Sequence, residues 1–160
     1  MKKITILIIS LITCLALGIW LYLYCTTPDN DLSKERIDNI GVNQPFKNEQ
    51  NKFLVDPMIQ LEGKTFYRSK QYKALIIRKD NKQNRITAVT LFKYAKLKTS
   101  RDIHIGSTKA AVIEAYGDTY KKSILPKQQT QFHYKDKENH IGMKFIFKND
   151  LVKKIELFEE

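Results

Sequence analysis

The longest hydrophobic pattern in the chain is an uninterrupted apolar stretch near its start. Residues 4–25 contain no charged side chain; Lys2 and Lys3 precede them, and the first acidic residue is Asp29. A helix of that length spans about 33 Å, against about 30 Å for the hydrocarbon core of a bilayer. The pattern therefore predicts one N-terminal transmembrane helix, a signal anchor over residues 1–25, which contacts the lipid bilayer through residues 4–25.

The charges beside this stretch predict its orientation. Two lysines precede it, whereas residues 29–38 carry four carboxylates and only two cations. Positive flanks stay in the cytoplasm, so we expect a single-pass protein of the cell membrane with a cytoplasmic N-terminus and an extracytoplasmic C-terminal domain. Two other interpretations remain open. One is a secretory signal peptide cleaved after Gly18, and the other is a lipoprotein modified at Cys14 or Cys25.

Polar residues dominate the next part of the chain, residues 26–52. Its apolar residues occur singly, and Pro28, Gly41 and Pro45 interrupt it. Such a segment cannot bury enough apolar surface to offset the entropy lost on ordering. We therefore expect a flexible extracytoplasmic linker, with at most one short helix around residues 32–39, followed by a globular domain over residues 53–160.

Apolar and polar residues alternate in several runs of that domain, which predicts antiparallel strands. The period of two is clearest in residues 140–148, and short polar turns suited to hairpins separate the runs. The expected strands cover residues 64–68, 72–79, 85–93, 131–135, 140–148 and 151–158. With one main helix between the third and fourth, the order is β-β-(β)-α-β-β-β. The predicted fold class is therefore α+β, with a single N-terminal transmembrane helix before a small antiparallel domain.

The one helix expected in this domain covers residues 107–116. Ser107 is the expected N-cap, and Gly117 stands where a left-handed residue commonly ends a helix. Val112, Ala115 and Tyr116 share one face at i, i+3 and i+4. Because an isolated helix this short is unstable, we expect that face to pack on the sheet.

A family resemblance accompanies the helix. Residues 103–109 (IHIGSTK), followed by Val112, Tyr116 and Gly117, resemble the I-G-x-[ST]-x-x-x-V-x-x-x-[YF]-G module of small extracytoplasmic bacterial proteins. That module is similar to the β-lactamase-inhibitor-like fold, also seen in envelope lipoproteins of the SmpA/OmlA type, and the resemblance covers residues 103–158. It implies a non-catalytic binding or assembly role in the bacterial cell envelope.

Composition adds a strong positive charge. The chain has 28 Lys and Arg against 17 Asp and Glu, a net charge of +11. Scattered cations are typical of a solvated surface, but a basic exported domain also suits an anionic envelope polymer or an acidic protein. The candidate anion-binding residues are Lys73, Arg78, Arg85 and Lys93. Nucleic acid is not an expected partner, because the sequence has no recognisable nucleic-acid motif and the domain is expected outside the cell.

The sequence contains no chemistry-specific motif. Both cysteines, Cys14 and Cys25, belong to the apolar stretch, so the domain has no disulfide and no thiolate nucleophile or metal ligand. The histidines His104, His133 and His140 lack metal-binding spacing, and there is no glycine-rich phosphate loop. We therefore expect no enzymatic activity, no cofactor and no metal.

These observations together predict a function in the cell envelope. The expected protein is a membrane-anchored extracytoplasmic binding or assembly module that engages an anionic or acidic partner. The alternative is an inhibitor or immunity-type protein that blocks one specific envelope partner.

Overall fold

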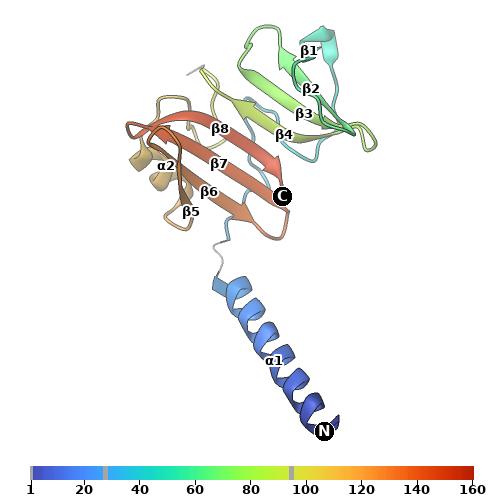
Figure 1. The fold of residues 1–160 in the computed structure, drawn as a ribbon. Helices are drawn as coiled ribbons and strands as arrows, with labels where there is room; N and C mark the ends of the chain where they lie inside the picture. The colour runs from blue at the N-terminus through green and yellow to red at the C-terminus, as the bar shows by residue number, and fades with distance from the viewer. Residues whose placement is uncertain (1, 27–28, 94–95) are drawn as a thin grey trace.

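The computed structural model describes residues 2–26, 29–93 and 96–160, and side chains for residues 9–22, 29–93 and 96–160. The elements, shown in Figure 1, are α1 (Lys2–Thr26), the 3-10 turn η1 (Glu49–Asn51), β1 (Phe53–Val55), β2 (Lys64–Ser69), β3 (Leu75–Asp80), β4 (Arg85–Leu91), α2 (Lys109–Tyr116), β5 (Lys121–Leu125), β6 (Gln129–Asp136), β7 (Ile141–Lys148) and β8 (Leu151–Glu159).

The described strands form one antiparallel sheet in the order β1-β2-β3-β4-β8-β7-β6-β5. Each half is a meander of consecutive strands, β1–β4 and β5–β8, and the halves join where β4 pairs with β8 (Figure 1). At that junction Val89 lies opposite Leu157, and Leu91 lies opposite Ile155. All four of these side chains are buried. The two meanders therefore share one sheet and one core.

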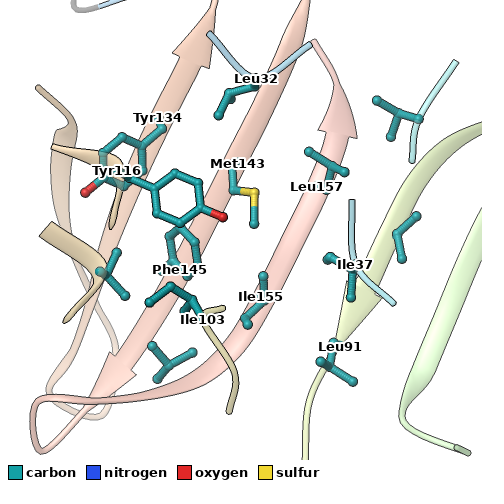
Figure 2. Packing of buried hydrophobic residues seen from close by; sticks show 14 of the residues in the cluster. Leu32, Ile37, Leu91, Ile103, Tyr116, Tyr134, Met143, Phe145, Ile155 and Leu157 are labelled. Carbon is teal, nitrogen blue, oxygen red and sulfur yellow. The ribbon is translucent and has the colours of Figure 1, made fainter. Parts of the chain in front are cut away.

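The core is thickest where α2 covers the β5–β8 half. Val112 of α2 is fully buried, and its neighbour Tyr116 places its ring centroid 4.9 Å from that of Phe145 and 5.4 Å from that of Tyr134. Figure 2 shows these three rings grouped on the left of Met143. Burying one such side chain contributes about 1.5–3 kcal/mol, so packing holds this short helix in place. The predicted helix face against the sheet is confirmed.

The helix begins one residue later than predicted. Thr108 is the N-cap, and its hydroxyl accepts a hydrogen bond from the N–H of Ala111 at 3.1 Å. Ser107 instead accepts from the N–H of His104 at 3.0 Å and closes the preceding turn. Two adjacent hydroxyls can both cap a helix, and the backbone geometry decides between them. Gly117 ends the helix with a positive φ of 84°, as expected.

Residues 29–43 are folded onto the domain, so the flexible linker predicted for residues 26–52 is wrong for this part. Leu32 and Ile37 are fully buried, and the N–H of Leu32 donates to the carboxylate of Asp136 at 2.8 Å. The predicted helix over residues 32–39 is absent from the described chain, which instead makes turns and an isolated bridge between Ile37 and Ile40. Single apolar residues suffice here because the sheet supplies the surface on which they are buried.

A buried carboxylate fastens this segment to the helix. The side chain of Glu35 is only 2% exposed and accepts hydrogen bonds from the hydroxyl of Tyr116 at 2.9 Å, the N–H of Ser100 at 3.0 Å and Nε of Arg101 at 3.2 Å. The guanidinium of Arg101 also lies over the Tyr116 ring, 4.6 Å from its centroid. Burial, reinforced by the negative charge of Glu35, raises the pKa of Tyr116. We call these four residues the Glu35 cluster.

The predicted fold class is wrong in its count of elements. The described sheet has eight strands. Along the chain, four strands precede α2 and four follow it, whereas the predicted order was β-β-(β)-α-β-β-β. The two strands missed are β1 and β5, which form the two edges of the sheet. Neither shows the apolar-polar alternation of a half-buried strand, because an edge strand with little cover gains little from it.

The predicted membrane anchor is also corrected. Among the described residues, the structure contains no helix long and apolar enough to cross a membrane. This finding contradicts three predictions. They are the signal anchor over residues 1–25, its contact with the bilayer through residues 4–25, and the single-pass cell-membrane localisation with an extracytoplasmic domain. The side chains of Lys2, Lys3 and Cys25, on which parts of that prediction rested, lie outside the described residues.

Candidate binding surface at the β1 edge

Large hydrophobic side chains are exposed to solvent on β1 and in the connection from β1 to β2. Five of them are strongly exposed: Leu54 by 56%, Val55 by 57%, Met58 by 88%, Ile59 by 38% and Leu61 by 54%. We call these five residues the β1-edge surface. In the rest of the described domain, the exposed large hydrophobic residues are Ile124 and Leu151, which stand singly. Clustered exposure of this kind is typical of an interaction site.

The sequence explains why this surface stays open. Strand β1 is three residues long, lies at the end of the sheet and pairs only with β2. Pro57 follows one residue later, after Asp56, and its ring removes the N–H that a longer strand would need. Phe53 is half-buried against Phe46, with ring centroids 6.1 Å apart. Leu54 and Val55 point to opposite faces of the strand, and both remain more than half exposed.

A side-chain amide partly closes the outer edge of β1. The carboxamide of Asn48 donates to the carbonyl of Phe53 and accepts from its N–H, both at 2.9 Å. Backbone groups in an antiparallel strand point alternately toward and away from the partner strand. Lys52 and Asp56 bond toward β2, so the groups of Phe53 face away from it. Asn48 thus occupies the place of a further strand at Phe53. Val55 is the other β1 residue whose backbone groups face outward, and this amide does not bond them.

A groove of about 470 Å³ opens beside this edge. It is lined by Leu54, Val55, Asp56, Pro57, Met58, Arg68, Ser69, Lys70 and Lys73, and we call it the edge groove. Apolar side chains come from β1 and the turn after it, whereas basic ones come from β2 and the residues between β2 and β3. The groove therefore combines an apolar wall with a cationic rim.

The charges of the groove are not balanced. The carboxylate of Asp56 is 3% exposed and forms an ion pair with the guanidinium of Arg68, whose Nε lies 3.1 Å away. Arg68 is fixed further by a 2.6 Å hydrogen bond from Nη1 to the carbonyl of Lys73. Lys70 and Lys73 are exposed, and neither ammonium forms an ion pair with a described carboxylate. Two positive charges consequently face the solvent at the groove.

Comparisons with known proteins give little. No family model matches the chain, and a search of curated proteins finds no match. Among solved structures, the chain is similar to the crystal structure of a DUF4309 family protein, YjgB, from Bacillus subtilis subsp. subtilis str. 168. The identity is 13%, the match covers 73% of this chain and 72% of that chain, and the TM-score is 0.38. A similarity at this level carries no argument, and the resemblance to the SmpA/OmlA type remains a prediction.

The structure separates the four predicted anion-binding residues. Lys73 lines the edge groove. Arg78 is engaged internally, since its Nε donates to the hydroxyl of Thr87 at 3.1 Å and its Nη2 to the carbonyl of the same residue at 3.2 Å. Arg85 forms an ion pair with Glu159.

Lys93 is exposed in a bend beyond β4. Strand spacing cannot reveal that the two arginines have partners within the fold. Lys70 was missed as a site residue. Its position directly after a strand can be inferred from the sequence, but its place beside the apolar residues of β1 depends on strand pairing.

The histidines form no shared site. Within the described residues there is no group of three or more His, Cys, Asp or Glu placed to hold a metal ion. His133 lies on the face of the sheet opposite α2, with its Nε2 2.7 Å from a carboxylate oxygen of Glu160. Partial burial lowers the pKa of His133, an effect that the Glu160 charge opposes and the ammonium groups of Lys144 and Lys135 reinforce. Because its pKa is lower in the folded chain, protonation of this histidine makes stability depend on pH.

Proposed function

We propose that this chain is a binding protein that engages a protein partner through the β1-edge surface and catalyses no reaction. The observation that carries the proposal is the exposure of five large hydrophobic side chains within residues 54–61 of a domain whose other large apolar residues are nearly all enclosed. Water contact with apolar surface costs about 25 cal/mol per Å², and a partner that covers the surface recovers this free energy.

The charge of the chain supports a partner with acidic character. The net charge is +11, and Lys73, one of the predicted anion-binding residues, lies at the groove beside this surface. A positive field of this kind accelerates encounter with an acidic protein. The role proposed for Arg78 and Arg85 is smaller, because their guanidinium groups already have partners inside the domain.

Selection from a displayed random-peptide library against the full chain tests the proposal. The decisive variant is Leu54→Ser with Met58→Ser, which removes apolar area at two exposed positions and should leave the fold intact. The matched control is Ile124→Ser, because Ile124 is 82% exposed on β5, at the opposite edge of the sheet. Selected peptides should bind the wild type and the control alike and the double variant at least tenfold more weakly. No enrichment, or equal binding to the double variant, contradicts the proposed function.

A further inference from the structure

The edge groove has the size and lining of a side-chain pocket. Its volume of about 470 Å³ falls within the range of about 300–1,000 Å³ that is usual for ligand sites. Leu54, Pro57 and Met58 provide its apolar wall, and Val55, whose side chain points to the other face of β1, also borders it. Met58 is unbranched and 88% exposed, so its side chain can change rotamer and close over an occupant. These walls suit a large apolar side chain better than a polar one.

The charges at the groove specify what stands next to that side chain. Asp56 is the only carboxylate among the lining residues, and its pairing with Arg68 leaves it no free charge to offer an incoming cation. Lys70 and Lys73 are exposed at the same groove. A carboxylate beside the apolar side chain would meet two ammonium groups there, whereas a cation would be repelled.

The backbone at this edge argues against recognition by strand addition. A peptide that extends a sheet needs a row of free N–H and C=O groups. In β1 the carboxamide of Asn48 already bonds both groups of Phe53, and Pro57 ends the strand just beyond Val55 and Asp56. One residue cannot hold a strand in register. Binding by side chains fits this edge better than pairing of backbones.

We infer that the edge groove binds a short segment of a partner protein in which an apolar side chain enters the groove and an adjacent Asp or Glu contacts Lys70 and Lys73. The inference rests on the proposed function and adds to it the chemistry of the partner. The segment is recognised by its side chains and does not add a strand to the sheet.

Fluorescence polarisation with three synthetic peptides carrying a neutral dye tests this inference on the full chain. The first peptide places Leu next to Glu in a Gly/Ser background, the second replaces Glu by Gln, and the third replaces Leu by Ser. The variants are Lys70→Gln with Lys73→Gln, and Leu54→Ser with Met58→Ser. The charge control is Lys121→Gln with Lys122→Gln, which removes two exposed lysines from β5 at the far edge of the sheet.

The Leu-Glu peptide should bind the wild type and the charge control equally. Its Kd should rise about twofold to thirtyfold when Lys70 and Lys73 are changed, or when Glu becomes Gln, because either change removes two exposed ion pairs of about 0.2–1 kcal/mol each. The charge-dependent part of the binding should disappear at 1 M salt, where the Debye length is about 3 Å. Loss of the Leu side chain should weaken binding at least as much.

The outcomes separate this inference from the proposed function. Binding that needs Leu54 and Met58 but is indifferent to Lys70, Lys73 and the Glu would overturn the inference and leave the proposed function standing. Binding that ignores Leu54 and Met58 would overturn both. A dimer in sedimentation velocity that dissociates on Leu54→Ser with Met58→Ser, without binding of any peptide, would make a second copy of the chain the occupant and also overturn the inference.

Discussion

The two ends of this sheet treat similar hydrophobic residues in opposite ways. In the β5–β8 half, Phe132, Tyr134 and Phe145 are at most 2% exposed. At the β1 end, Leu54 and Val55 are more than half exposed. Both halves are antiparallel meanders, so the difference does not lie in strand pairing. It lies in what covers the strands, and a sheet end that is left uncovered keeps its apolar side chains available for another molecule.

The cover of the buried half comes from distant parts of the chain. Helix α2 follows the first meander, whereas Leu32 and Ile37 come from the segment before it (Figure 2). The Glu35 cluster holds these two covering pieces together. No described residue does the same for the β1-edge surface. The comparison can be tested by making the same change in both regions.

The largest expected effect is that of a charge placed in the covered half. Val112→Asp should unfold the domain, because it buries an unpaired carboxylate at a position with no solvent exposure, at a cost of several kcal/mol. Val55→Asp, the same change at an exposed position of β1, should lower the free energy of unfolding by less than about 1 kcal/mol. Urea denaturation of the full chain measures both. Similar losses for the two variants would show that the β1 end is as enclosed as the core.

The next effect concerns the Glu35 cluster. Glu35→Ala should lower the free energy of unfolding by about 2–4 kcal/mol, because it leaves the buried hydroxyl of Tyr116 and the N–H of Ser100 without their acceptor. Glu114→Ala on the exposed face of α2 is the matched control and should change stability by less than about 0.5 kcal/mol. An equal effect of both substitutions would remove the cluster from the account of how residues 29–43 are held.

A smaller effect is expected at the start of the covering helix. Thr108→Ala should cost about 1 kcal/mol, since the hydroxyl of Thr108 is the acceptor for the N–H of Ala111. Ser107→Ala should cost less, because Ser107 closes a turn and does not cap the helix. Thermal unfolding of the two variants compares them directly. The reverse order would return the N-cap to Ser107, as the sequence predicted.

The smallest effect is a pH dependence on the uncovered face of the β5–β8 half. Because the pKa of His133 is lowered from 6.5 in the folded protein, the unfolded chain binds more protons below that pH. Stability should therefore fall as the pH drops from about 7 through 6.5 toward the lowered pKa. Glu160 and the lysines Lys135 and Lys144 face the same ring and set the size of the effect.

The measurement is urea denaturation between pH 7.5 and 5.5. His133→Gln should flatten the slope in this window, while His104→Gln, at a histidine outside the strands of the sheet, serves as the control. A slope that persists unchanged in His133→Gln would assign the dependence to other groups.

Local pattern predicted much of the strand framework. The runs at residues 85–93, 140–148 and 151–158 alternate because one face of each strand is buried, and the structure has strands β4, β7 and β8 there. Gly117 ended the predicted helix correctly because only a residue tolerant of positive φ fits that position. Signals of this type act within a few residues, and so the sequence displays them.

The candidate site was only partly predictable. Lys73 was among the predicted anion-binding residues and lines the edge groove. Arg78 and Arg85 were predicted with it, but their partners, Thr87 and Glu159, are brought to them by strand pairing. The sequence did not indicate that the apolar residues of β1 are exposed, because an apolar run has the same pattern whether it becomes core or surface.

The sequence by itself determined the inner strands β2–β4 and β6–β8, the position of the domain's helix and the excess of positive charge. The tertiary structure alone decided that residues 29–43 join the core, that β1 and β5 form the two edges, and that the apolar residues of β1 remain exposed. The physical reason is that alternation and capping depend on neighbours along the chain, whereas burial depends on which distant surface arrives to cover a side chain. Leu32 found such a surface and Leu54 did not.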